Sequence, residues 1–225
     1  MAGRSPAPEA EKRAAAWAAA RLIRPGMTVG LGSGSTVAGL VEVLAQARPD
    51  ACFIAASPAT AAAAEQHGLP LVALDAVAGL DLAIDGADQI DPSGWLIKGG
   101  GAAHTREKLV AAAARRFIVI ASSDKLVERL RAPLPLELLP FAPATTIAAI
   151  GSTRRRANTP ASPDGGVIAD YHGPIDDPGQ LARKLDQQPG VIAHGLFPPA
   201  MVDLVLVGRD SGRVEVFRPN RRQSA

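Results

Sequence analysis

The sequence predicts an α/β protein in which a doubly wound, mostly parallel sheet is joined to a smaller α+β unit. Short apolar runs typical of strands alternate with helical segments from residue 9 to residue 121, at the spacing of β-α-β units. The character of the chain then changes at Ala132, after which four prolines crowd residues 133–143. Apolar residues make up 47% of the chain and charged residues 20%, which excludes disorder throughout.

The first half of the chain alternates between helix and strand signals. An alanine-rich segment at residues 9–24 is predicted to be a helix that ends at Pro25-Gly26. Residues 27–31 are typical of a short buried strand, which leads through a glycine-rich turn into a helix at about residues 37–47. The later elements expected are, in order, a strand at 52–56, an alanine-rich helix closed near residue 68, strands at 71–74 and 82–84, a helix from 102 to about 116, and a strand at 117–121.

The second half is predicted to form a small mixed α+β unit before the chain returns to the first sheet. Its expected elements are an apolar segment at 145–150, a strand at 167–171, a helix at about 178–185 and an extended segment at 191–197. Residues 202–207 are typical of a strand of the first sheet, with 214–217 as an edge strand. We therefore expect one domain from residues 1–131 plus 200–225 and a second, smaller domain from residues 132–199.

Composition argues against several classes of protein. The single cysteine, Cys52, rules out a disulfide framework and fits a reducing compartment, so a cytoplasmic location is expected. The four histidines show no metal-ligand spacing, and no built-in metal site is expected. Charged residues precede and interrupt the apolar run at 14–20, which is therefore not a signal peptide, and no apolar stretch is long enough to span a bilayer.

The basic residues of the chain are locally concentrated. The formal net charge is only +2, but arginines cluster at residues 154–156 and again at 218–222. Aromatic residues are sparse and no nucleic-acid motif is present, so we interpret these arginines as solvated and expect no nucleic-acid partner.

A glycine-rich loop, Gly32-Ser33-Gly34-Ser35-Thr36, lies between the first predicted strand and its helix. Its bare amides, its hydroxyls and the helix N-terminus would suit a phosphate. The same residues would equally form an ordinary helix cap. The loop lacks the lysine of a nucleoside triphosphate site, and no carboxylate for a ribose follows the next strand, which weakens a dinucleotide interpretation.

Two further clusters follow within a short stretch. Asp85 and Asp88 come directly after a predicted strand, at the sheet edge where open α/β sheets bind ligands. Turn chemistry would explain one such aspartate but less readily a close pair. Lys98 then precedes Gly99, Gly100 and Gly101, which would cost conformational entropy unless backbone amides must approach something closely.

Glu107 falls in the first turns of the next predicted helix, where a carboxylate is also favourable for the helix dipole alone. Together with Lys98 and the aspartates in one cleft, however, it suits a reaction in which protons move and negative charge develops on oxygen. Shielding from water is expected to raise the pKa of Glu107 toward the working range. An enzyme is therefore the leading hypothesis.

These motifs, in this order, resemble the ribose-5-phosphate isomerase A family, over about residues 12–208. The resemblance rests on the segments VGLGSGST at 29–36, DGAD at 85–88, KGGGAA at 98–103 and TREK at 105–108, with PLPLE at 133–137, YHG at 171–173, and PGV and GLF at 189–197. It implies a Rossmann-like domain with an inserted α+β domain of the ferredoxin or ACT type, and an aldose–ketose isomerase that needs no cofactor. It also implies a sugar phosphate substrate and a dimer or tetramer, for which the small domain is the expected oligomerisation unit.

The resemblance assigns roles by position. Glu107 matches the catalytic base, and Asp85, Asp88 and Lys98 match the other catalytic residues. Substrate would be bound by Gly32, Ser33, Gly34, Ser35 and Thr36, by Gly99, Gly100 and Gly101, and by Lys125 on the phosphate. The chain departs from the family pattern at Gln89, where a glutamate is usual, at Ser122 and Asp124 in the segment before Lys125, and at Ala55, where a hydroxyl is expected.

Two other classes of function share this architecture. Sugar-phosphate-sensing domains of transcription regulators bind without catalysis, but they are accompanied by a helix-turn-helix, for which the short N-terminal segment has no room. Acyl-CoA transferases of related fold use a glutamate nucleophile on a thioester. Incubation with ribose 5-phosphate and with an acyl-CoA would separate the three classes.

Overall fold

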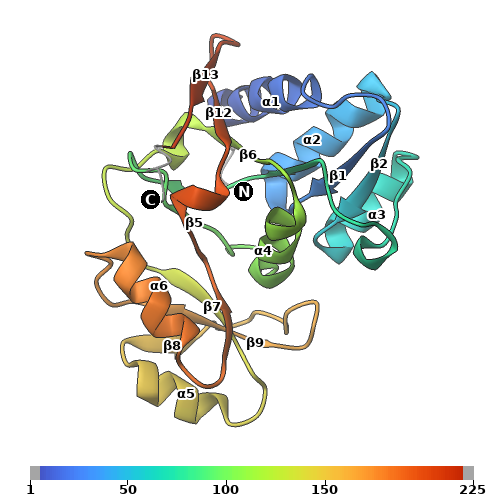
Figure 1. Cartoon of the computed structure of the whole chain (residues 1–225). Helices are drawn as coiled ribbons and strands as arrows, with labels where there is room; N and C mark the ends of the chain where they lie inside the picture. Colours follow the sequence, from blue (N-terminus) through green and yellow to red (C-terminus); the bar gives the residue numbers. More distant parts are fainter. Residues whose placement is uncertain (1–5, 220–225) are drawn as a thin grey trace, which may run out of the picture.

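The computed structural model describes residues 6–219 and is built around a six-stranded sheet (Figure 1). The strand order is β13-β12-β6-β3-β1-β2. All neighbouring strands are parallel except β13, which pairs antiparallel with β12 at one edge. The strands are β1 (Met27–Leu31), β2 (Ala51–Ala55), β3 (Leu82–Asp85), β6 (Phe117–Ser122), β12 (Leu204–Gly208) and β13 (Val214–Phe217). The predicted mostly parallel sheet is thereby confirmed.

Helices cover both faces of this sheet, because its central strands are apolar on both sides. Helices α1 (Pro6–Ala20) and α2 (Gly34–Ala47) pack on one face, with a core formed by alanines of α1, Leu40 and Leu44 of α2 and Ile118 and Ile120 of β6. Helix α4 (His104–Ala113) packs on the other face through Val110 and Ala111. Helix α3 (Pro58–Gln66) follows β2, and short 3-10 turns lie at Leu74–Ala76, Ser123–Lys125 and Pro199–Met201.

A second, four-stranded antiparallel sheet lies apart from the first and is flanked by two helices (Figure 1). Its strand order is β10-β7-β9-β8. The elements of this four-stranded unit are β7 (Leu134–Leu138), α5 (Pro143–Ile150), β8 (Thr153–Arg155), β9 (Val167–Tyr171), α6 (Pro178–Asp186) and β10 (Val191–His194). Leu134, Leu136 and Leu138 point into its core.

A small three-stranded sheet joins the two units. Strands β4 (Gln89–Ile90) and β5 (Leu96–Ile97) form a hairpin after the acidic turn, and β11 (Leu196–Phe197) pairs antiparallel with β5. Lys98 follows β5 directly, so its backbone is fixed where the six-stranded sheet and the four-stranded unit meet.

Several predicted elements were wrong in position or kind. Residues 71–74 make only an isolated bridge from Leu71 to Phe53, and α4 ends at Ala113 instead of near residue 116. The extended segment at 191–197 is broken into β10 and β11. No element was predicted for the proline-rich segment after Ala132, which contains strand β7, and the apolar residues 145–150, for which no kind was predicted, lie in helix α5. Arg221 and Arg222, at the end of the second arginine cluster, lie outside the described residues.

Strand β7 contains Pro135 at an inner position of its sheet, where proline is normally excluded because it cannot donate to the ladder. Here the Gly195 N–H donates to the Pro135 carbonyl at 2.8 Å, and the Gly195 carbonyl accepts the Lys98 N–H at 2.8 Å. The backbone of Lys98 thus supplies the donor that proline lacks. These two hydrogen bonds also anchor the backbone of the catalytic candidate Lys98 to the four-stranded unit.

Candidate active site

The predicted site residues converge on a cavity of about 180 Å³ at the carboxyl ends of β1 and β3. Of the residues predicted from sequence, all but Gly32 and Asp85 line this cavity. They come from the β1–α2 turn, the turn after β3, the glycine loop after β5, the first turns of α4 and the 3-10 turn after β6. These segments are far apart in sequence, and the parallel sheet brings them together at one edge.

Lys98 is the centre of a buried ionic cluster. Its ammonium nitrogen lies 2.7 Å from Oδ2 of Asp85 and 3.1 Å from Oε2 of Glu107, and it donates to the Gly86 carbonyl at 2.6 Å. The three ionic side chains are at most 4% exposed. One ammonium thus faces two carboxylates in a medium that screens charge poorly.

The protonation of this cluster follows from that imbalance. Burial and the nearby Glu107 charge raise the pKa of Asp85 from 3.8 to about 7, although Lys98 opposes them. Burial would also raise the pKa of Glu107, but the Lys98 charge and the Ser33 hydroxyl outweigh it and hold the pKa of Glu107 below its ordinary value. Burial lowers the pKa of Lys98, but Asp85 and Glu107 more than compensate and raise it above its ordinary value. The expected upward shift of the Glu107 pKa was therefore wrong, and the raised pKa belongs to Asp85.

Glu107 lies in the first turn of α4 and faces the cavity. Its Oε1 accepts a hydrogen bond from the Ser33 hydroxyl, and its Oε2 contacts Lys98. Both carboxylate oxygens are therefore held in place, which is what a base needs in order to meet a carbon-bound proton at a fixed angle.

Asp85 ends strand β3 and lies behind the cavity instead of lining it. Its Oδ1 accepts the backbone N–H groups of Ser33 at 3.1 Å and Gly86 at 2.7 Å. Gly32 packs directly against this carboxyl, because a Cβ at position 32 would lie 1.7 Å from Asp85 Cγ. The structure thus gives Gly32 a place in the support of Asp85, not in the wall of the cavity where it was predicted.

A cationic end of the cavity surrounds the start of α2. Ser35 and Thr36 lie in the first turn of this helix, and Lys125 lines the cavity from the 3-10 turn after β6. Sequence reasoning missed a second lysine, Lys12 of α1, which lines the same cavity and donates to Ser35 Oγ at 3.1 Å. Two ammonium groups, hydroxyls and a helix N-terminus are chemically suited to an anion such as a phosphate.

The glycine loop closes the opposite side of the cavity. Gly99 has a φ of +104°, a conformation that side chains disfavour. The Gly100 N–H donates to Asp88 Oδ2 at 2.9 Å, whereas the N–H groups of Gly99 and Gly101 have no hydrogen-bond partner within the described part of the chain. The loop therefore offers backbone donors to an anionic oxygen.

The departures from the family pattern have local explanations. The Gln89 amide donates to the Arg131 carbonyl and accepts the Arg131 N–H, both at 2.8 Å, a pairing that an ionised glutamate could not complete. Asp124 accepts from the Ser122 hydroxyl and contacts Lys125 at 3.0 Å. Ala55 lines a different cavity, so the missing hydroxyl is not taken from the candidate active site.

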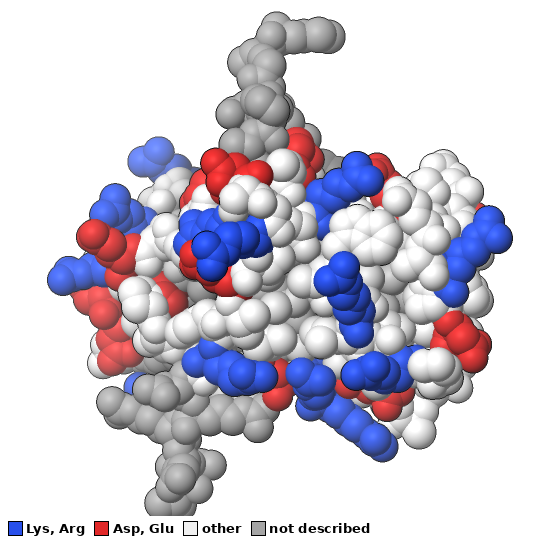
Figure 2. All heavy atoms as spheres, turned by 90° about the horizontal axis from the view of Figure 1, so that it is seen from above, with Lys and Arg blue, Asp and Glu red and all other residues white. Residues whose placement is uncertain are grey.

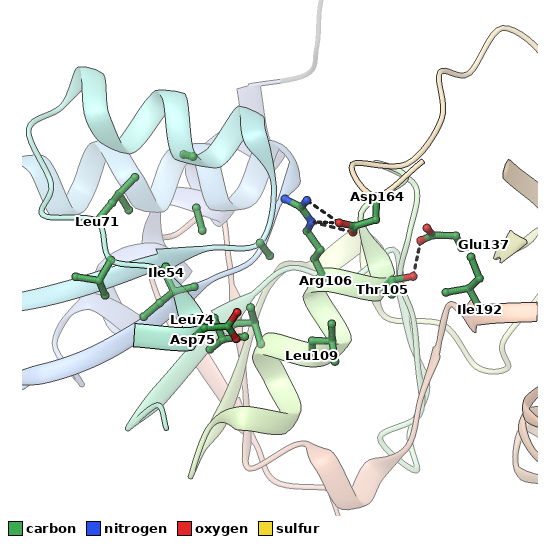
Figure 3. A pocket seen from close by; sticks show the side chains of 16 residues that line it. Ile54, Leu71, Leu74, Asp75, Thr105, Arg106, Leu109, Glu137, Asp164 and Ile192 are labelled. Atoms are coloured by element: carbon green, nitrogen blue, oxygen red, sulfur yellow. Dashed lines mark hydrogen bonds and ion pairs between the residues drawn. The ribbon is translucent and has the colours of Figure 1, made fainter. Parts of the chain in front are cut away.

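That second cavity, of about 660 Å³, is larger but mainly apolar. Figure 3 shows it between the segment around Leu71 and Leu74, helix α4 and the four-stranded unit. Its main polar groups are paired with one another, Arg106 with Asp164 and Thr105 with Glu137. It therefore offers a reacting molecule far fewer unpaired polar groups than the smaller cavity does. Helix α4 contributes residues to both cavities.

Other classes of site find little support in the described residues. Among residues 6–219 no group of three or more potential ligands is arranged to hold a metal ion, and no helix there is long and apolar enough to cross a membrane. On the face seen in Figure 2, basic and acidic side chains are interspersed instead of gathered into one basic patch. Arg154 and Arg155 are exposed, but Arg156 is not, and the interpretation of all three as solvated was wrong for Arg156.

Comparison with known proteins points to one family. A model of the family "Ribose 5-phosphate isomerase A (phosphoriboisomerase A)" matches residues 52–212. A ribose-5-phosphate isomerase A of Roseiflexus sp. (strain RS-1) is 43% identical over 228 residues, covering 94% of this chain and 97% of that protein.

Solved structures agree with this match. The ribose 5-phosphate isomerase A of Neisseria gonorrhoeae superposes with a TM-score of 0.88 at 31% identity, covering 93% of this chain and 96% of the other. A D-ribose-5-phosphate isomerase in complex with phospho-erythronic acid also gives 0.88, at 34% identity, covering 94% of this chain and 99% of the other.

Proposed function

This chain belongs to the ribose 5-phosphate isomerase A family and is an aldose–ketose isomerase; we propose that it interconverts D-ribose 5-phosphate and D-ribulose 5-phosphate through an enediolate, with Glu107 as the base. The observation that carries the assignment is the position of Glu107. Its carboxylate is held by Ser33 and Lys98 in the wall of a cavity whose other end is cationic.

Glu107 takes the proton from C2 of the open-chain aldose and later returns it to C1. Because the pKa of Glu107 lies below its ordinary value, the side chain is ionised and ready to accept a proton across the neutral range. As the C2–H bond breaks, negative charge moves to O1. Lys98 and the free backbone N–H groups of the glycine loop stabilise that charge, and preorganised donors of this kind contribute about 3 to 4 kcal/mol each.

The hydroxyl proton must also move from O2 to O1. Asp88 lines the cavity and is the carboxylate placed to hold these oxygens and to relay this proton, and it would also assist opening of the sugar ring. Asp85 lies behind Lys98, so we assign it a positioning role that acts through the Lys98 ammonium. Base and electrophile are both supplied by side chains, so the reaction needs no cofactor.

The phosphate group binds at the cationic end of the cavity, to Lys12, Ser35, Thr36 and Lys125. Binding there is remote from the reacting carbons, and its energy is used to align C1 and C2 with Glu107. Phospho-erythronic acid, the ligand of the related solved structure, carries both a phosphate and a carboxylate, and it fits a site with a phosphate end and an anion-stabilising end.

We further propose that residues 132–199 are an inserted α+β domain of the ferredoxin or ACT type, within a Rossmann-like domain of residues 1–131 plus 200–225. The element order β-α-β-β-α-β and the strand order β10-β7-β9-β8 support this division.

The inserted domain is also the proposed contact of a homodimer or homotetramer, since it exposes Phe141 (83%) and Leu139 (45%). Light scattering on Phe141→Ser should show a smaller assembly than the wild-type protein; an unchanged mass would refute this contact.

We assign the enzyme to the cytoplasm, where a lone free cysteine such as Cys52 stays reduced.

A direct assay tests the function. Purified protein is incubated with ribose 5-phosphate in D₂O, and formation of ribulose 5-phosphate and exchange at the transferred hydrogen are followed by NMR. Product and exchange are expected. Binding without turnover would favour a sensor domain, and acyl transfer from an acyl-CoA would favour a CoA transferase.

A further inference from the structure

Arg156 directly follows strand β8 of the four-stranded unit, and its side chain reaches the glycine loop of the active site. The guanidinium forms a bidentate ion pair with Asp170 of β9: Nε donates to Oδ2 at 2.8 Å and Nη2 to Oδ1 at 2.5 Å. The two side chains are only 19% and 13% exposed. The Arg156 N–H also donates to the Ile168 carbonyl, so both ends of the residue are fixed.

The remaining nitrogen of this guanidinium reaches the glycine loop. Nη1 donates to the Gly100 carbonyl at 3.1 Å and to the Gly99 carbonyl at 3.3 Å. From the other side, Asp88 accepts the Gly100 N–H. The loop is therefore held between an arginine of the four-stranded unit and an aspartate of the turn that follows β3.

Three consecutive glycines have no side chains with which to anchor themselves, and their backbone freedom opposes a fixed conformation. A hydrogen bond to the Gly100 carbonyl restricts the peptide unit whose other end is the Gly101 N–H. It also polarises that unit, which makes the N–H a stronger donor. The Gly101 N–H has no partner within residues 6–219 and belongs to the cavity wall.

We propose that Arg156 is a positioning residue for catalysis, which orients the glycine loop so that the Gly101 N–H donates to the sugar oxygen on which negative charge develops. The inference rests on the proposed isomerase function. The four-stranded unit thereby takes part in the chemistry through one side chain, Arg156. That side chain contacts neither the phosphate end of the cavity nor Glu107.

The neighbouring residue offers a matched control. Arg155 carries the same charge one position earlier, but it is exposed on β8 and makes no hydrogen bond or ion pair through its side chain among the described residues. Arg156→Gln and Arg155→Gln therefore remove the same charge from almost the same place, and only the first releases the glycine loop. Arg156→Lys keeps the charge but not the planar fork, and is expected to recover only part of the activity.

The experiment compares kcat, KM and inhibitor binding in these variants. For Arg156→Gln we expect kcat to fall about 10- to 100-fold with KM changed less than about threefold, as for a small misplacement of catalytic groups. Binding of phospho-erythronic acid, measured by calorimetry, should weaken much more than inhibition by inorganic phosphate, since only the former places an anionic group near the loop. Thermal unfolding shows whether each variant keeps its fold. Asp170→Asn weakens the bidentate ion pair while keeping Arg156, and should show the same changes in kcat and inhibitor binding to a smaller extent.

Two results would overturn the proposal. One is a kcat of Arg156→Gln within twofold of wild type, and the other is an equal loss of affinity for phosphate and phospho-erythronic acid, which would indicate general damage. Failure of the wild-type protein and of Arg155→Gln to convert ribose 5-phosphate would instead refute the isomerase function on which the proposal depends.

Discussion

The ammonium of Lys98 lies 3.1 Å from Oε2 of Glu107, and both side chains are almost completely buried. The proposed base and the proposed electrophile are therefore paired with each other in the free enzyme. A substrate that inserts its C1–C2 unit at this pair would place the proton to be removed beside the carboxylate and the oxygen that becomes charged beside the ammonium. Charge development then occurs where a compensating charge is already fixed.

Replacement of Glu107 with glutamine should abolish most of the activity. The amide keeps the shape of the side chain but cannot accept a proton, and loss of a general base typically costs about 10²- to 10⁴-fold in rate. We expect kcat for ribulose 5-phosphate formation to fall by this factor, and hydrogen exchange with D₂O at the sugar to disappear with it.

Glu42→Gln, on the exposed side of α2, is the matching control and should leave kcat unchanged. Retention of near wild-type turnover by Glu107→Gln would remove this residue from the role of base, whatever the effect on KM.

Asp85→Asn should stabilise the fold at neutral pH while lowering the activity. The pKa of Asp85 rises from 3.8 in the unfolded chain to about 7 in the folded one, mainly through burial. The unfolded state therefore releases this proton first, and stability is lost as the pH rises from about 4 to about 7. Asparagine removes that loss, so we expect the melting temperature at pH 8 to rise by about 2 to 6 °C.

The pH dependence distinguishes this explanation from a general change in packing. The gain in melting temperature should be small at pH 4, grow up to pH 7 and remain constant above it. An equal gain at pH 4 and pH 8 would show that ionisation of Asp85 is not the cause.

The six-stranded sheet and most of the site were predictable because their signals are local. Asp85 and Glu107 each lie within a few residues of a strand end or helix start, and parallel strands bring such ends to one edge. Lys12 was missed because it lies in an alanine-rich helix 23 residues before Ser35, and only the packing of α1 against the sheet brings the two together. Glu9, Glu11 and Arg13 lie close to it in sequence, so Lys12 resembled an ordinary charged residue near the start of a helix. Strand β7 was not predicted because it contains Pro135, which has no N–H to donate. The Gly195 carbonyl opposite Pro135 accepts the N–H of the distant Lys98 instead.

Lys12→Ala should raise KM for ribose 5-phosphate about 10- to 100-fold with a smaller effect on kcat, since a charged hydrogen bond to phosphate contributes roughly 1.5 to 3 kcal/mol. Lys125→Ala should act in the same direction, but less strongly, because the Lys125 side chain is 33% exposed and that of Lys12 only 11%; each ammonium is also paired with one carboxylate, of Asp124 and Glu9 respectively. Inhibition by inorganic phosphate should weaken in parallel.

Lys184→Ala, on the exposed side of α6, provides the control for the loss of a lysine. Unchanged KM and phosphate inhibition in the Lys12 variant would exclude this lysine from the phosphate site.

His104→Leu should make the protein more resistant to acid. The ring is completely buried, and neither nitrogen has a well-formed hydrogen bond among the described residues. Burial lowers the pKa of His104 from 6.5 to about 4, so the unfolded state takes up this proton first and stability is lost as the pH falls from about 6.5 toward 4. The variant should melt at a higher temperature than wild type at pH 5. His67→Leu, at an exposed position, should not change the acid limb; a parallel shift in both variants would contradict the explanation.

Gly32→Ala should inactivate the enzyme although Gly32 does not itself line the cavity. The added Cβ would lie 1.7 Å from Asp85 Cγ, so Asp85 must move, and Lys98 loses the carboxylate 2.7 Å from its ammonium. We expect kcat to fall at least as far as in Asp85→Asn, because the alanine displaces a group that the asparagine only neutralises. Gly39→Ala is the contrasting substitution: nothing lies within 4 Å of its Cβ, and alanine in the middle of α2 should raise stability by about 1 kcal/mol with activity unchanged. An active Gly32→Ala enzyme would mean that the Asp85–Lys98 contact is not needed for catalysis.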